Sequence, residues 1–310
     1  MLNLAIIGGG PAGLSAGLYA TRGGIKDVVL FDKGMPGGQI TSSSEVENYP
    51  GVTEVKDGLS FITPWTEQCT RFGLKIEMKN VTNIEKNGEI FTINFDDNTK
   101  EEAKAVIVAT GSRPKKAGFK GENEFFGLGV STCAVCDGFF YKGKEVAVIG
   151  GGDTALEESL YLADICSKVY LIHRRDEFRA APSTVSKVKE NPKIELVLNS
   201  TIDEAYGDKT NGLMGIKVKN KISNEIRDIA VPGLFTFVGL DVQNEILKDK
   251  DGKFICDVLE AGQVKTNLRM QTSLEGLYVA GDLRQDAPKQ LVCAASDGAI
   301  AALEAANYLR

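Results

Sequence analysis

The sequence contains a single histidine, His173, among its 310 residues. A Ser-His or Cys-His catalytic pair would have to use this one side chain. His173 is the first residue of the basic run His-Arg-Arg-Asp-Glu-Phe-Arg. We therefore expect it to lie beside a bound anion and not in a catalytic pair. Any acid or base that serves catalysis elsewhere in the chain is therefore expected to be a carboxylate.

Positive charge is scarce as well. The 36 Lys and Arg residues are outnumbered by 42 Asp and Glu, which gives a formal net charge of -6 and a pI near 5.2. Nucleic acids and anionic membranes favour a basic face, so no nucleic acid and no membrane is expected as a partner. The apolar N-terminal run, residues 1–7, has no cationic leader and ends at Gly8. It is too short for a signal peptide or a membrane span, and a cytoplasmic location is the default expectation.

Cysteines are too few and too widely spread for a secreted disulfide framework, with six in a chain of 310 residues. Four of them stand alone in the sequence. We expect these four to be small core residues or unreactive thiols: Cys69, Cys166, Cys256 and Cys293.

The other two form the motif Cys133-Ala-Val-Cys136, followed directly by Asp137. One interpretation is a zinc site, which needs about four ligands, although no second CxxC or nearby histidine supplies them. A second is a pair of buried structural thiols, and a third is a redox pair that alternates between thiols and a disulfide. The redox interpretation is favoured because an acid adjoins the pair and a glycine-rich loop begins 12 residues after Gly138 (150 minus 138). Asp137 is the candidate catalytic acid.

That loop belongs to an internal repeat. The sequence LAIIGGGPAG from Leu4 matches VAVIGGGDTA from Val146 at a constant offset of 142 positions (146 minus 4). In each copy an apolar strand leads into glycines, then into a helix (residues 11–22 and 153–164) and a second strand (27–31 and 168–172). Two such βαβ units predict an α/β protein with two Rossmann-like domains, in keeping with a length that suggests about two domains.

The two copies differ at the end of the second strand. The first copy has Asp32 there, whereas the aligned position in the second copy (32 plus 142) is Arg174. In both, the glycines let a pyrophosphate approach the backbone at the start of the helix. A carboxylate accepts hydrogen bonds from free ribose hydroxyls, whereas Arg binds a 2′-phosphate bidentately. The first copy is therefore expected to hold FAD or NAD, and the second to hold NADP.

Together these motifs resemble those of the low-molecular-weight (bacterial-type) thioredoxin reductases, homodimeric flavoproteins of the class II pyridine nucleotide-disulfide oxidoreductase family. The most specific part of the resemblance is the combination CxxCDG, GGGDTA and HRRxxFR at these spacings. Further matching segments are GGQ at Gly37, EVENYPG at Glu45, ATG at Ala109 and VAGD at Val279. The resemblance covers essentially the whole chain.

The resemblance implies an NADPH-binding domain, residues 115–244, that carries the CxxC and is inserted into a discontinuous FAD-binding domain, residues 1–114 and 245–310. A strand at residues 276–280 and a final helix at about 294–309 would complete the FAD domain. The expected FAD contacts are Gly8, Gly10, Pro11, Ala12, Gly13, Asp32, Lys33, Gly34, Met35, Pro36, Gly37, Gly38, Gln39, Asn48, Val81, Ala109, Thr110, Gly111, Gly281, Asp282, Lys289, Gln290 and Leu291. The expected NADPH contacts are Gly150, Gly151, Gly152, Asp153, Thr154, Ala155, His173, Arg174, Arg175 and Arg179.

The resemblance also implies the reaction. NADPH would reduce FAD, FAD would reduce the disulfide between Cys133 and Cys136, and the reduced pair would reduce oxidised thioredoxin. Cys136 would face the flavin, Cys133 would attack thioredoxin, and Asp137 would carry the proton. Because the nicotinamide and the cysteine pair both need one flavin, we expect the inserted domain to rotate on linkers near residues 114 and 239–241.

Two departures from the family pattern affect the flavin edge: the acid at Asp32, and the segment from Gln285 to Lys289 before Gln290, which lacks the Arg-Gln pair common in the family. Two other functions stay open. A flavoprotein reductase of the same fold, such as a ferredoxin-NADP reductase or an oxidase, would keep both nucleotide loops but would not need the CxxC. A zinc-binding or scaffold module would be the non-enzymatic alternative.

Overall fold

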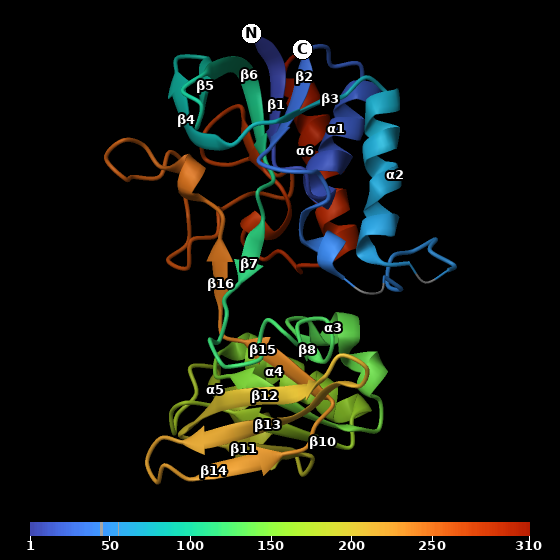
Figure 1. Ribbon diagram of the computed structural model, residues 1–310. Helices are drawn as coiled ribbons and strands as arrows, with labels where there is room; N and C mark the ends of the chain where they lie inside the picture. Colours follow the sequence, from blue (N-terminus) through green and yellow to red (C-terminus); the bar gives the residue numbers. More distant parts are fainter. Residues whose placement is uncertain (44–45, 55) are drawn as a thin grey trace. The chain divides into compact units, whose positions relative to one another are not determined.

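The computed structural model describes residues 1–43, 46–54 and 56–310 (Figure 1). The chain divides into two compact units. Unit 1 comprises Met1–Arg113 and Val242–Arg310, and unit 2 comprises Pro114–Asp241. Each unit contains one copy of the repeated glycine loop at the end of a parallel strand. The predicted fold class, an α/β protein with one Rossmann-like domain inserted into another, is confirmed.

Unit 1 is built on a 7-stranded sheet in the order β3-β2-β1-β6-β5-β4, with β17 paired to β6. The pairs that join β1, β2, β3, β6 and β17 are parallel, whereas β5 is antiparallel to both β4 and β6. The carboxyl ends of β1, β2, β6 and β17 therefore meet at one edge. The strands are β1 (Leu2–Ile7), β2 (Val28–Asp32), β3 (Lys75–Met78), β4 (Val81–Asn87), β5 (Ile90–Phe95), β6 (Lys100–Val108) and β17 (Leu277–Val279).

Strand β1 is apolar from Leu4 to Ile7 because both faces of this stretch are covered. Leu4 and Ile6 lie in one core cluster, whose members include residues of helices α1, α2 and α6. Ala5 and Ile7 point to the opposite face, into a second cluster with residues of β4 and β5. Alternate residues of a strand point to opposite faces, so a strand between two cores has no polar side.

Helices α1 (Pro11–Arg22), α2 (Gly58–Arg71) and α6 (Leu291–Tyr308) belong to unit 1. The predicted helix at 11–22 is confirmed, and the final helix begins at Leu291, earlier than the expected residue 294. Helix α6 packs directly on α1: a Cβ atom on Gly298 would lie 1.9 Å from Ala12 O, and Ser15 Oγ donates a hydrogen bond to Ala295 O at 2.6 Å. The last segment of the chain is thereby held against the first glycine loop.

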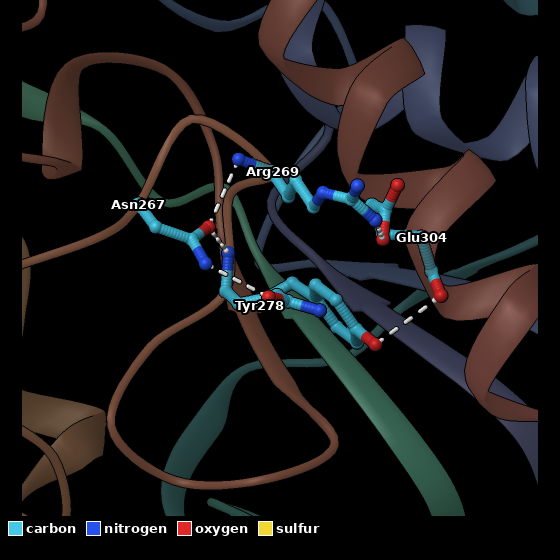
Figure 2. A network of polar contacts seen from close by, with 5 residues as sticks. Asn267, Arg269, Tyr278 and Glu304 are labelled. Carbon is cyan, nitrogen blue, oxygen red and sulfur yellow. Dashed lines mark hydrogen bonds and ion pairs between the residues drawn. The ribbon is translucent and has the colours of Figure 1, made fainter.

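Strand β17 and the loop before it are tied to α6 by the polar network of Figure 2. Tyr278 donates a hydrogen bond through its hydroxyl to Glu304 O at 3.3 Å, and Arg269 forms an ion pair with the Glu304 carboxylate at 3.3 Å. Asn267 Oδ1 accepts hydrogen bonds from the backbone N–H groups of Arg269 and Gln271. Burial raises the pKa of Tyr278 to about 12, so the hydroxyl stays protonated and keeps its donor role.

Unit 2 has a 5-stranded parallel sheet in the order β11-β10-β9-β15-β8. A 3-stranded antiparallel sheet, β12-β13-β14, accompanies it. The strands are β8 (Val130–Ser131), β9 (Glu145–Gly150), β10 (Lys168–Ile172), β11 (Ile194–Val197), β12 (Ser200–Asp208), β13 (Gly212–Asn220), β14 (Ile226–Ile229) and β15 (Gly233–Phe237). The helices are α3 (Ala134–Asp137), α4 (Asp153–Ile165) and α5 (Pro182–Glu190).

The chain passes between the units twice, and the two connections pair with each other. Strands β7 (Ser112–Pro114) and β16 (Leu240–Val242) form a 2-stranded sheet. Backbone hydrogen bonds run from Gln243 N to Gly111 O at 3.0 Å and from Lys115 N to Gly239 O at 3.0 Å. In the part of the chain that the structure describes, no helix is both long enough and apolar enough to span a membrane.

Candidate functional site

The first glycine loop allows a turn that only glycine can make at two positions. Gly8 has φ +106°, and a Cβ atom there would lie 2.4 Å from Ala109 O. A Cβ atom on Gly13 would lie 1.8 Å from Gly8 O. The chain turns sharply after β1, and α1 begins at Pro11 with Gly10 as its N-cap residue. Because Gly10 has no side chain to cap the helix, the first N–H groups of α1 are left for a ligand.

Asp32, the last residue of β2, stabilises this loop through hydrogen bonds. Its Oδ2 accepts a hydrogen bond from Gly9 N at 2.5 Å, and its Oδ1 accepts one from Gly34 N at 2.9 Å. Gly37 N donates to Gly9 O at 2.8 Å, and a Cβ atom on Gly9 would lie 3.0 Å from Pro36 Cβ. The structure thus brings the segment after β2 against the glycine loop. Each carboxylate oxygen keeps a second lone pair, which a ribose hydroxyl can use.

The end of β6 completes the same edge of the sheet. Gly111 has φ +71°, and the preceding Thr110 donates its hydroxyl hydrogen to Gln243 O at 2.6 Å. Gln39, in the short helix η1 (Gly38–Ser42), donates its side-chain amide to Ser112 O. These contacts connect the segments after β2 and β6.

The segment after β17 is held by a buried ion pair. Arg284 Nε lies 2.7 Å from Asp297 Oδ2, and Arg284 Nη2 lies 3.1 Å from Asp297 Oδ1. Asp297, on α6, also accepts a hydrogen bond from Gly281 N at 3.1 Å. A Cβ atom on Gly281 would lie 3.1 Å from Ala12 Cβ, so this turn lies on the start of α1. Burial raises the pKa of the next residue, Asp282.

Three further residues expected at this site are Asn48, Lys289 and Gln290. Asn48 donates its side-chain amide to Gln290 Oε1 at 3.3 Å, and Gln290 is the N-cap residue of α6, just before Leu291. Lys289 is exposed and has φ +56°. The contact of Asn48 with Gln290 links two segments far apart in the sequence.

Lys33 and Met35 are exposed on the loop after β2, and Met35 is 81% exposed. Val81 is buried at the start of β4. Glu45, the first residue of the EVENYPG segment, lies outside the described residues.

The edge formed by these segments fits an adenine dinucleotide. A Cβ atom on Gly10 would have Gly38 Cα as its nearest neighbour at 3.8 Å, and one on Gly111 would have no neighbour within 4 Å. Backbone is therefore accessible beside the uncapped start of α1, where the helix dipole favours negative charge. Accessible backbone and a positive helix end are what a diphosphate requires.

The second glycine loop has the same construction. A Cβ atom on Gly150 would lie 2.6 Å from Phe237 O, and one on Gly151 would lie 2.0 Å from the ring of His173. Gly152 is the N-cap residue of α4, and a Cβ atom there would have no neighbour within 4 Å. The loop is packed tightly beneath Gly150 and Gly151 and is open at Gly152, where a phosphate would bind.

The only histidine organises the basic segment that follows β10. The His173 ring is buried, stacks on Phe178 with ring centroids 5.2 Å apart, and places Nε2 3.1 Å from Glu177 O. Burial is the main cause that lowers the pKa of His173, with smaller contributions from the neighbouring arginines. The imidazole is thus neutral near pH 7 and serves as a packing and hydrogen-bonding group.

Three exposed guanidinium groups lie on this segment, those of Arg174, Arg175 and Arg179. Among the described residues, none of the three forms an ion pair with a carboxylate. The backbone of the last one is fixed to the glycine loop by a hydrogen bond from Arg179 N to Gly151 O at 2.7 Å. Unpaired guanidinium groups beside a dinucleotide loop are suited to binding a phosphate.

Cys133 and Cys136 form a disulfide with a Cα–Cα distance of 5.3 Å. Cys133 is the N-cap residue of the short helix α3, which brings the two sulfur atoms within bonding distance. Cys136 is exposed and Cys133 is half-buried. The pair is therefore an accessible disulfide rather than two buried structural thiols.

Asp137 ends α3 directly beside the disulfide. Burial raises the pKa of Asp137, while a side-chain hydrogen bond with Ser131 lowers it by a smaller amount. Ser131 is itself buried, and its Oγ accepts a hydrogen bond from Cys133 N at 3.1 Å. The nearby Tyr141 has its pKa raised to about 12 by burial and by the charge of Asp137. A carboxyl group with a raised pKa is suited to exchanging protons near neutral pH.

Comparison with known proteins agrees with this arrangement. Residues 2–298 match the family described as Pyridine nucleotide-disulphide oxidoreductase. The chain belongs to this family. It is 59% identical over 309 residues to a protein named thioredoxin reductase from Helicobacter pylori, and the matched region covers 100% of this chain and 99% of that protein.

Solved structures of this family agree as well. The crystal structure of thioredoxin reductase from Streptococcus pyogenes has a TM-score of 0.92 at 34% identity, covering 100% of this chain and 98% of that one. Thioredoxin reductase from Giardia duodenalis has a TM-score of 0.93 at 36% identity, covering 99% and 98%. The predicted family is confirmed, and FAD and NADPH, the cofactors expected from the sequence, are those of its thioredoxin reductases.

In this family member the remaining cysteines are separate from the disulfide. Cys69, Cys166 and Cys256 are buried and Cys293 is half-buried. Burial raises the pKa of Cys69 and Cys256 to about 11 and also raises that of Cys166. Thiols of this kind are poor nucleophiles near neutral pH.

Sequence reasoning missed Ser131, Arg284 and Asp297. Ser131 carries a weak signal, since it stands two residues before Cys133, within reach of an N–H group in the next turn. Arg284 and Asp297 stand 13 residues apart, and the spacing predicts no contact until α6 is placed beside the Gly281 turn. Their pairing is a product of the tertiary fold.

Proposed function

We propose that the protein is an NADPH-dependent thioredoxin-disulfide reductase. The observation that carries this proposal is the accessible disulfide of Cys133 and Cys136 beside the half-buried acid Asp137, in the same unit as the arginine-bearing nucleotide loop. When bound, FAD supplies the redox chemistry, since it takes a hydride from NADPH and passes two electrons to a disulfide.

Unit 1 is the proposed FAD-binding domain. The backbone of the first glycine loop and the start of α1 would bind the diphosphate, and Asp32 would accept hydrogen bonds from the ribose while holding the loop. Asp282 and the residues from Lys289 to Leu291 would lie beside the ribityl and ring portions. The other expected contacts on the segments after β2 and β6 would enclose the cofactor and exclude water.

Unit 2 is the proposed NADPH-binding domain. The open position at Gly152 and the start of α4 would bind the pyrophosphate, with Thr154 and Ala155 in the first turn. The 2′-phosphate would lie among the three exposed guanidinium groups listed above. An Arg at the place of the first copy's carboxylate favours NADPH over NADH because it supplies positive charge and paired donors.

The cysteines divide the thiol chemistry between them. Two electrons break the S–S bond and leave a thiolate on each sulfur, and Asp137 supplies a proton to one of them. Cys133, the attacking sulfur, then displaces one sulfur of the thioredoxin disulfide, and the departing thiolate takes up a proton. Cys136 then returns its proton to Asp137 and attacks the resulting mixed disulfide, which re-forms the Cys133–Cys136 bond. The second thioredoxin sulfur leaves as a thiolate and takes up that proton, which releases reduced thioredoxin.

NADPH would donate electrons to the flavin, and the disulfide would accept them from it. The disulfide and the NADPH loop both belong to unit 2, so they must approach the one flavin in turn. We propose that unit 2 rotates on the paired connections β7 and β16. A cross-link that fixes the units in one orientation should permit one half-reaction and block the other; normal rates for both would refute the rotation. By resemblance to the family, the protein is also proposed to be a cytoplasmic homodimer.

The test is to add NADPH to the purified protein with an oxidised thioredoxin and to follow nicotinamide oxidation, then to repeat it with NADH. Turnover with NADPH, much weaker turnover with NADH and loss of turnover in Cys133→Ser are expected. If Cys133→Ser keeps its physiological turnover, the protein is a same-fold flavoprotein reductase that does not use the disulfide. A strong preference for NADH would contradict the role given to Arg174.

A further inference from the structure

The basic segment from His173 to Ala181 is fixed to the second glycine loop at several points, none of which uses a guanidinium group. The His173 ring lies against Gly151, and Arg179 N donates to Gly151 O at 2.7 Å. At the far end, Ala181 N donates to Asp153 Oδ1 at 2.7 Å. The arginine side chains remain exposed while the backbone that carries them is held.

Among the residues that hold this segment, Asp153 carries a negative charge at the place where a phosphate is expected. It is the first residue of α4, directly after Gly152, where a nucleotide phosphate is expected. A carboxylate there repels phosphate, although it gains some stabilisation from the helix dipole. The negative charge of Asp153 therefore weakens binding of the proposed ligand. Any contribution of Asp153 that favours binding must come from the hydrogen bond that it accepts from Ala181 N.

We propose that Asp153 is a positioning residue for recognition of the 2′-phosphate, and not a direct contact of the nucleotide. This inference rests on the proposed binding of NADPH by unit 2. By accepting the hydrogen bond from Ala181 N, Asp153 fixes the end of the segment two residues beyond Arg179. His173 fixes the other end through Gly151 and Glu177 O.

Holding both ends lowers the entropic cost of binding. A free nine-residue loop (173 to 181) would have to become ordered when its guanidinium groups close on a phosphate, and that ordering reduces affinity. A segment whose backbone is already fixed presents its charges without this cost. The benefit applies only to a ligand that carries a 2′-phosphate, because only that group meets the segment.

The matched variants are Asp153→Ala and Asp153→Asn. Both remove the negative charge, but only Asn keeps a side-chain oxygen that accepts the hydrogen bond from Ala181 N. Binding is measured by calorimetry with two probes that differ in one group, adenosine 2′,5′-bisphosphate and adenosine 5′-monophosphate. The measured quantity is the ratio of the two affinities, which needs no turnover.

We expect Asp153→Ala to bind the bisphosphate roughly three- to tenfold more weakly than Asp153→Asn does, the range for loss of one hydrogen bond. The monophosphate should bind both variants equally, and the melting temperatures should agree. Equal bisphosphate affinity in the two variants would overturn the proposal. An equal loss for both probes would also overturn it, since that result assigns Asp153 to the whole nucleotide loop.

The wild-type protein separates this proposal from the function on which it rests. A wild-type preference for the bisphosphate over the monophosphate supports NADPH binding, and the comparison of variants then decides the role of Asp153. If the wild type has no such preference, the proposed NADPH specificity fails, and with it the need for a positioning residue.

Discussion

Ser131 Oγ accepts a hydrogen bond from the backbone N–H of Cys133 at 3.1 Å. A side-chain hydrogen bond with Ser131 also lowers the pKa of Asp137, against the larger effect of burial. One buried serine therefore connects the first cysteine of the disulfide with the acid that is proposed to serve it.

Replacing Ser131 by Ala should raise the pKa of Asp137 further, because only burial then acts on the carboxyl group. The pH at which Asp137 loses its proton should move upward in the rate profile of the reduced protein with a small disulfide. Ser131→Thr, which keeps the hydroxyl, should leave the profile nearly unchanged. An unshifted profile in Ser131→Ala would show that the serine only supports the backbone.

Asp137→Asn should slow thiol-disulfide exchange by about a hundredfold or more, as expected for loss of a general acid. Reduction of bound flavin by NADPH, measured by its absorbance in a stopped-flow experiment, should proceed at the wild-type rate. Loss of both half-reactions would show that Asn disturbs more than the proton transfer.

The same variant should be more stable than the wild type at neutral pH. Burial raises the pKa of Asp137 in the folded protein above its unfolded value. This group therefore contributes stability at low pH that is lost as the pH rises through the folded pKa. Asn cannot ionise and does not lose it. The gain, measured by chemical denaturation, should shrink as the pH falls through the folded pKa and should be absent below about 4, the ordinary pKa of an aspartic acid.

Asp297→Ala should destabilise unit 1 by about 3–5 kcal/mol, because it leaves Arg284 buried without its partner. The side chains of this pair are only 16% and 6% exposed. Gly281 N loses its acceptor as well, so the affinity of the apoprotein for FAD should fall. Arg269→Ala is the control: it removes the exposed partner of Glu304, since the Arg269 side chain is 68% exposed, and should cost less than about 1 kcal/mol. Similar losses in both variants would contradict the special place of the buried pair.

Gly152→Ala should separate folding from nucleotide binding. The added methyl group would have no protein neighbour within 4 Å, so stability should change by less than about 1 kcal/mol. It would occupy the space proposed for the pyrophosphate, and both NADPH and NADH should bind at least tenfold more weakly, about 1.4 kcal/mol or more. Binding is measured by calorimetry, with Gly34→Ala, also in open space, as the control in unit 1. Unchanged NADPH affinity would place the nucleotide elsewhere.

Much of the fold could be predicted from local sequence. The repeated LAIIGGG and VAVIGGG segments combine an apolar strand, a glycine turn and a helix, and each of these is set by residues close together in the chain. The helix at 11–22 and the strand at 168–172 have the predicted bounds. Helix α6 begins before the predicted residue 294, since Leu291 and Val292 also suit an extended segment and their sequence does not mark the start of the helix.

The sequence by itself determined the chemistry: the CxxC with its adjacent acid, the two glycine loops, and the contrast between Asp32 and Arg174. Each of these depends on the identity and spacing of near neighbours. Only the tertiary structure decided which distant groups support them. Asp153 meets Ala181 across 28 residues, and Ser15 meets Ala295 across 280. Such contacts depend on sheet order and helix packing, which bring remote segments together and which no local pattern specifies.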